Sequence, residues 1–74
     1  MRRYLNLSGS SGVTYYEIGA DFIRVKFRGD QPVYRYSHAG AGKDHVERMK
    51  TLAVAGRGLG TYISQNVHDA YDRD

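Results

Sequence analysis

Hydrophobic and polar residues alternate along the first half of the chain as β-strands require. In residues 22–28 apolar and basic side chains take alternate positions, namely Ile23, Val25 and Phe27 against Arg24, Lys26 and Arg28. Successive side chains of a strand point to opposite faces, so this segment is predicted to have one apolar and one basic face. Residues 13–18 and 33–36 are rich in β-branched and aromatic residues and predict two further strands.

The second half of the chain changes to a helical spacing. Apolar residues recur every three or four positions on both sides of a glycine-rich break, namely Val46, Met49 and Ala53 before it and Leu59, Ile63, Val67 and Ala70 after it. This spacing places each set on one side of a helix. We expect one helix that ends at Gly56 and a second over about residues 60–71.

Together these elements predict an α+β fold. Short turns join the strands, which favours a three-stranded antiparallel β-meander, followed by two C-terminal helices packed on one face in the order β-β-β-α-α. Residues 37–42 are expected to be a loop. Residues 13–72 are predicted to form a single domain, preceded by residues 1–12 as either a flexible segment or an edge strand.

Composition and charge narrow the classes of protein to which the chain can belong. The chain has 74 residues and no cysteine, which excludes disulfides and thiolate metal sites, and a chain this small often gains stability by self-association. No apolar run is long enough to span a membrane, so we expect a cytoplasmic protein without a membrane partner. Residues 1–36 hold six Arg and Lys against three acids, a bias that permits an anionic partner.

The succession of short motifs resembles a known family. SSGV, YEIG, VKF, YRY and a helix ending in MKTLAVAGRGLGTYI follow one another as in the KTSC-type domain, which occurs at the C-terminus of some lysyl-tRNA synthetases, and in short stand-alone bacterial proteins of that type. The matching positions are Ser11, Val13, Val25, Phe27, Tyr34 and Tyr36, with Ala53, Gly58 and Ile63 in the helical part. The resemblance implies little chemistry beyond an association with nucleic acid.

A basic strand face is the leading candidate site. Arg24, Lys26, Arg28 and Arg35, interleaved with Tyr34 and Tyr36, could hold RNA or single-stranded DNA by phosphate contacts and base stacking. The alternative is an ordinary polar face that keeps the sheet in solution, with the tyrosines in the core.

The glycine-rich break is a second candidate. Arg57 and Gly58 precede a predicted helix, whose first N–H groups attract anions. The break follows a helix rather than a strand and lacks the Gly-Lys-Ser/Thr ending of a phosphate-binding loop, so tight turning between helices explains the glycines equally well.

Other chemistry has little support in the sequence. His38, His45 and His68 lack the spacing of metal ligands, and catalytic groups occur only as they do in most proteins. We therefore expect a binding module that is not an enzyme and holds no cofactor or metal. The alternative function is protein interaction or homodimerisation, since the seven tyrosines suit either an interface or a core.

Overall fold

The computed structural model of the protein describes residues 1–9 and 11–72. Within these residues four strands form one antiparallel sheet in the order β1-β2-β3-β4, and helices follow. The strands are β1 (Arg2–Arg3), β2 (Val13–Ile18), β3 (Phe22–Phe27) and β4 (Val33–Ser37). The α+β class is confirmed, whereas the prediction of three strands is wrong by one, because the N-terminal segment adds a short edge strand to the meander.

The three central strands pair as a meander with short turns. In the register of β3 and β4, Val25 lies opposite Tyr34 and Ile23 opposite Tyr36. These four side chains point to the helix side of the sheet, where Ile23, Val25 and Tyr36 are almost fully buried. The apolar face that the alternation predicted is therefore the face that packs against the helices.

Strand β1 is short but firmly attached. Arg2 and Arg3 pair with Tyr16 and Tyr15, and the next residue, Tyr4, is buried. The Tyr4 hydroxyl accepts a hydrogen bond of 3.2 Å from the backbone N–H of Leu59. The predictions for residues 1–12 fall partly on Ser10, which lies outside the described residues.

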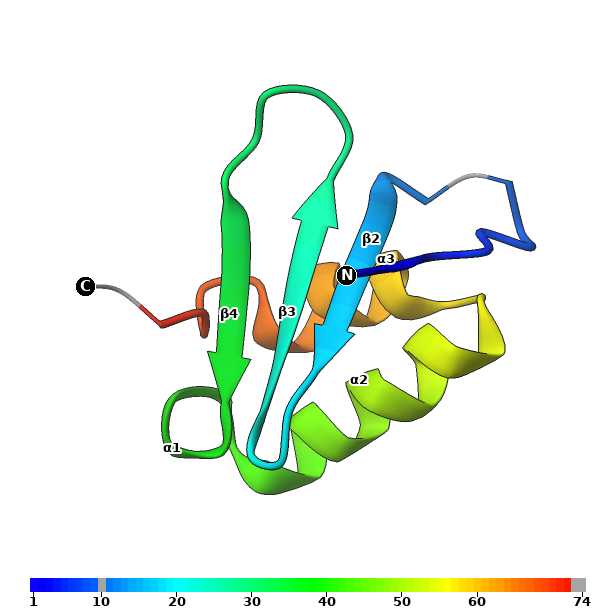
Figure 1. Cartoon of the computed structure of the whole chain (residues 1–74). Coiled ribbons are helices and arrows are strands. Elements are labelled where there is room, and N and C mark those ends of the chain that lie inside the picture. The colour runs from blue at the N-terminus through cyan, green and yellow to red at the C-terminus, as the bar shows by residue number, and fades with distance from the viewer. Residues whose placement is uncertain (10, 73–74) are drawn as a thin grey trace.

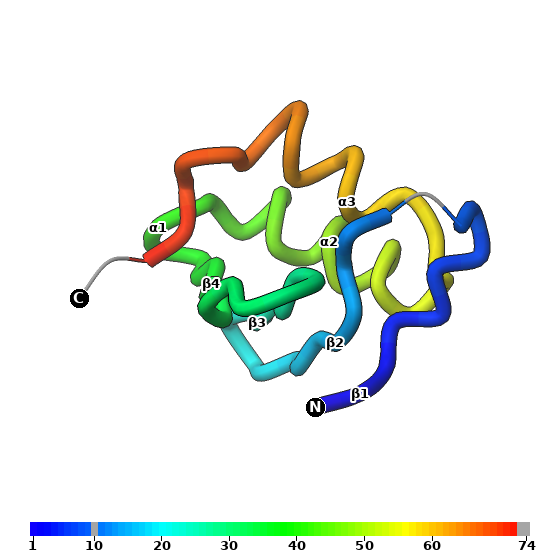
Figure 2. Tube along the Cα trace, turned by 90° about the horizontal axis from the view of Figure 1, so that it is seen from above, coloured from blue at the N-terminus to red at the C-terminus, as the bar shows by residue number. Residues whose placement is uncertain are grey.

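The helices lie together on one side of the sheet (Figures 1 and 2). They are α1 (His38–Ala41), α2 (Lys43–Ala55), α3 (Leu59–Tyr62) and a π-helical continuation, η1 (Ile63–Val67). The predicted loop at residues 37–42 contains the single turn α1, because the Ser37 hydroxyl accepts the N–H of Gly40 at 3.0 Å and so caps a helix start.

Glycines end α2 and begin α3. Gly56 has φ 78°, and its N–H bonds back to the carbonyls of Ala53 and Leu52, so the predicted left-handed helix end is confirmed. The second helix is shorter than predicted and stops at Val67. Ala70 and Tyr71 still pack against the core, but as part of an irregular tail.

One core fills the space between sheet and helices. Among the described residues it contains twelve that are buried: Tyr4, Val13, Tyr16, Ile23, Val25, Tyr36, Val46, Met49, Ala53, Leu59, Ile63 and Val67. Burial and the neighbouring Tyr34 and Tyr71 hydroxyls raise the pKa of Tyr36 to about 12. The helical stripes read from the sequence thus cover the apolar face of the sheet, and no described element covers the opposite face (Figure 2).

Candidate nucleic-acid interface

The side of the sheet away from the helices carries basic and aromatic side chains. Residues opposite each other in an antiparallel pair share a face, so the register places Arg3, Tyr15 and Lys26 in one cross-strand row. A second row contains Glu17, Arg24 and Arg35. Together these two rows, which we call the open face, bring three of the four predicted basic residues onto one surface.

A β-bulge determines which tyrosine reaches the open face. The register shifts between Val13 and Tyr15, so Thr14 is an additional residue in β2. The Thr14 hydroxyl donates to the Lys26 carbonyl at 3.0 Å, and its own carbonyl accepts the Tyr4 N–H at 2.9 Å. As a result Val13 and Tyr16 are buried, while Tyr15 is 43% exposed.

Tyr15 is a site residue that the sequence did not indicate. Simple alternation would place it on the same side as Val13, facing the helices. Nothing in the sequence marks the bulge, because the contacts that stabilise it come from Lys26 on another strand and from Tyr4 near the N-terminus. The sequence indicates only that Tyr15 and Tyr16, as consecutive strand residues, point to opposite faces.

Two of the predicted basic residues already have carboxylate partners. Arg24 Nη1 lies 2.6 Å from Glu17 Oε1. Arg35 forms an ion pair with Asp72, and its guanidinium also lies 4.6 Å from the centre of the Phe22 ring. Each of these arginine side chains is about half exposed, so the pairs are screened by solvent and exchangeable.

The other two basic residues have no carboxylate within ion-pair distance among the described residues. Lys26 reaches only the Gly29 carbonyl, at 3.5 Å. Arg28 lies beyond the end of β3 rather than in the strand, and lines a hollow beside Arg3, Thr14 and Tyr15. Arg3, which the sequence had not singled out, adds a further exposed cation.

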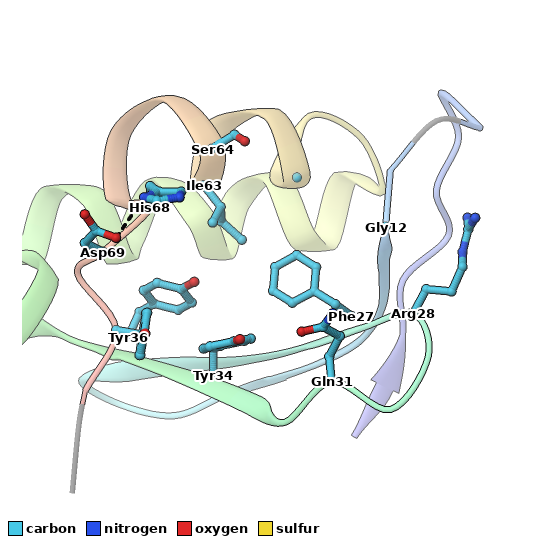
Figure 3. Close-up of a pocket in the computed structure, with 12 residues that line it drawn as sticks. Gly12, Phe27, Arg28, Gln31, Tyr34, Tyr36, Ile63, Ser64, His68 and Asp69 are labelled. Atoms are coloured by element: carbon cyan, nitrogen blue, oxygen red, sulfur yellow. Dashed lines mark ion pairs between the residues drawn. The ribbon is translucent and has the colours of Figure 1, made fainter.

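Tyr34 and Tyr36 do not join the basic residues. Both point to the helix side, where Tyr36 is buried and Tyr34 packs against the core (Figure 3). The Tyr34 ring lies 4.8 Å from that of Tyr71 in an edge-to-face arrangement. The basic side chains and these two tyrosines therefore occupy opposite faces, and the tyrosine that shares the open face with the basic residues is Tyr15.

The glycine turn offers fewer free N–H groups than the sequence suggested. Leu59 at the start of α3 donates its N–H to Tyr4, and the Arg57 N–H lies 3.4 Å from the Leu52 carbonyl. Gly58 has φ 80° and forms the tight turn itself. The structure places Arg57 at the surface, and α3 has only four residues, so the helix end by itself makes no anion site.

Comparison of the chain with protein-family models, curated proteins and solved structures finds no match. The resemblance to the KTSC-type domain therefore stays a prediction.

Each of the three histidines contacts one neighbouring polar side chain. His38 Nε2 lies 2.8 Å from Glu47, and hydrogen bonds from Lys50 first and His38 second lower the pKa of the Glu47 carboxyl. His45 shares a hydrogen bond of 2.7 Å with Tyr62. Within the part of the chain that is described, no three acidic or histidine side chains converge as metal ligands, and each helix is too short or too polar to cross a membrane.

Proposed function

We propose that the protein is a non-enzymatic, cytoplasmic binding module that holds single-stranded RNA or DNA weakly on the open face. The observation that carries this proposal is the cross-strand row in which Tyr15 stands between Arg3 and Lys26. An exposed ring can stack on any base, and cations on either side can contact the flanking phosphates. A four-stranded sheet with helices on one side leaves enough surface for a few nucleotides.

The charge pattern supports weak rather than tight binding. Arg24 and Arg35 are paired with Glu17 and Asp72, so their contribution requires the phosphates to compete with those carboxylates. The cations without carboxylate partners, mainly Arg3, Lys26 and Arg28, can make only a few contacts with phosphates. Affinity for nucleic acid comes largely from phosphate neutralisation and falls with salt, so a small number of contacts gives a modest affinity.

Substitution of Tyr15 tests the proposal. Tyr15→Ala removes the stacking surface and should lower the affinity for a short oligouridine or oligothymidine about tenfold, since stacking of one base contributes about 1–3 kcal/mol. Tyr15→Phe keeps the ring and should bind as the unsubstituted protein does. Fluorescence anisotropy of labelled oligonucleotides measures both. Equal binding by all three proteins would contradict a role for Tyr15.

A second function, homodimerisation, is favoured by exposed apolar side chains of the N-terminus, β2 and α2 that line one hollow beside a sheet edge. Met1, Ile18 and Val54 are 53%, 41% and 65% exposed and line a common hollow beside Arg2 and Glu17. Strand β1 pairs with β2 only at Tyr15 and Tyr16, so β2 beyond that point is an open edge. All seven tyrosines are described and only Tyr15 is exposed, so this edge suits an interface better than the tyrosines do.

Sedimentation equilibrium distinguishes this second function. If the edge pairs with a second copy, the protein sediments as a dimer and Val54→Glu shifts it to monomer by burying an unpaired charge at the contact. A monomer at every concentration would rule the dimer out.

A further inference from the structure

A groove opens between the sheet and the second helical segment, on the helix side of the molecule (Figure 3). Its volume is about 450 Å³, which is in the range of sites for small ligands. Phe27, Tyr34 and Tyr36 line it from the sheet, and Ile63, Ser64 and His68 line it from η1 and the turn that follows.

The walls of the groove are aromatic. The Phe27 and Tyr34 rings meet edge to face with centres 5.7 Å apart, and Tyr71 continues the series against Tyr34 and Tyr36. Phe27, Tyr34 and Tyr71 are only half-buried, so parts of their rings remain accessible to a ligand. Such walls favour a planar, unsaturated ligand over an aliphatic one.

The rim of the groove is polar. Gln31, Ser64 and His68 supply hydrogen-bond donors and acceptors. His68 is exposed and its Nδ1 lies 2.8 Å from Asp69 Oδ1, which leaves its other ring nitrogen as a donor or acceptor. A planar ligand with polar edges is therefore better matched than a plain hydrocarbon.

Arg28 connects this groove with the open face. It lines the groove and also the hollow beside Arg3 and Tyr15. Its guanidinium makes one long contact of 3.5 Å, with the Ser11 carbonyl, and Figure 3 shows it extending away from Tyr34 and Tyr36. No carboxylate of the described residues pairs with it, so it remains available to an anion at the junction of the two surfaces.

We propose that the groove takes one nucleobase of the bound strand, while the adjoining phosphate lies against Arg28. The aromatic walls suit the faces of a base, and the polar groups at the rim suit its edges. The cation at the mouth of the groove suits the phosphate. This inference rests on the proposed function and extends it, because the strand on the open face must turn around the end of β3 to place a base there. The groove would then fix one nucleotide of the strand in position.

Titration of labelled protein with three probes tests the site by NMR. Adenosine 5′-monophosphate contains base and phosphate, adenosine lacks the phosphate, and ribose 5-phosphate lacks the base. The monophosphate should shift the signals of Phe27, Tyr34 and Ser64 and bind more tightly than either of the other two. Silence of these signals at millimolar monophosphate, or shifts confined to Tyr15 and Lys26, would overturn the inference.

Variants that fill the groove connect the site with the strand. Ser64→Trp fills it from η1 and Gln31→Trp from the loop before β4, and both positions are exposed, so folding should persist. Each should lower the affinity for a short single strand about tenfold, as expected for the loss of one stacked base. Asn66→Trp on the same π-helix, which does not line the groove, is the control and should leave binding unchanged.

The outcomes separate this inference from the proposed function. If the strand binds the unsubstituted protein and the two filled variants equally, the base site is wrong and the open face stands. If the unsubstituted protein binds neither strand nor monophosphate, both are wrong.

Discussion

At the scale of single residues, the tyrosines differ in how their hydroxyl groups meet water or a partner. Tyr15 is exposed, the buried Tyr4 hydroxyl oxygen accepts a hydrogen bond from the Leu59 N–H, and Tyr36 is 2% exposed beside two further tyrosines. A sequence without tryptophan could be predicted to use tyrosine both in its core and at its surface. Which tyrosine goes where depends on the bulge at Thr14 and could not be predicted.

The raised pKa of Tyr36 makes stability depend on alkaline pH. Between the ordinary value of 10.0 and about 12, the unfolded chain releases this proton while the folded chain keeps it. Folding stability is therefore complete below pH 10 and falls as the pH rises through that window. The free energy of unfolding, measured by urea denaturation, should fall more between about pH 9 and about pH 11 for the unsubstituted protein than for Tyr36→Phe. Parallel losses would contradict the shift.

Removal of the Tyr4 hydroxyl should weaken the attachment of the N-terminal segment. Tyr4→Phe keeps the ring but leaves the buried Leu59 N–H without its acceptor, which costs about 1–3 kcal/mol. The free energy of unfolding from urea denaturation measures this cost. Tyr15→Phe removes an exposed hydroxyl instead and should change stability by less than about 0.5 kcal/mol. Equal stability of the two variants would show that the Tyr4 contact contributes nothing.

At the scale of elements, long periodic segments could be predicted and short ones could not. The strands around Val25 and Tyr34 and the helix ending at Gly56 follow from alternation, from helical spacing and from a glycine stop. Strand β1 has two residues and α1 has one turn, too few for any period to show. They form because β2 offers an open edge and because Ser37 caps Gly40, and neither cause shows in the spacing of apolar residues.

The two glycines around the helix break should differ in their tolerance of alanine. Gly56 and Gly58 both have left-handed φ angles, 78° and 80°, where a Cβ costs about 1–2 kcal/mol. A Cβ at Gly56 would also lie 2.8 Å from the Leu5 Cβ, whereas at Gly58 its nearest contact is an ordinary 3.6 Å. Gly56→Ala should therefore lower the midpoint temperature of thermal unfolding more than Gly58→Ala does. The reverse order would contradict this packing of Leu5.

At the scale of the whole molecule, the layers explain why one face is available for binding. The helical stripes cover one side of the sheet, and the uncovered side must be polar in water. The alternation along the strands predicted that Arg24, Lys26 and Arg35 lie on the face away from the core. The ion pair of Arg35 could not be predicted, because Asp72 reaches Arg35 from the far end of the chain.

The central claim is that the open face binds single-stranded nucleic acid through charge and stacking. The most direct measurement is an NMR titration of labelled protein with a short mixed-sequence RNA at two salt concentrations. We predict shifts of signals that include those of Arg3, Tyr15 and Lys26. The affinity should fall as salt rises, and the logarithm of the binding constant should decrease with the logarithm of the salt concentration with a slope of about −0.7 for each phosphate neutralised. A spectrum that does not change, or an affinity that does not depend on salt, would contradict the claim.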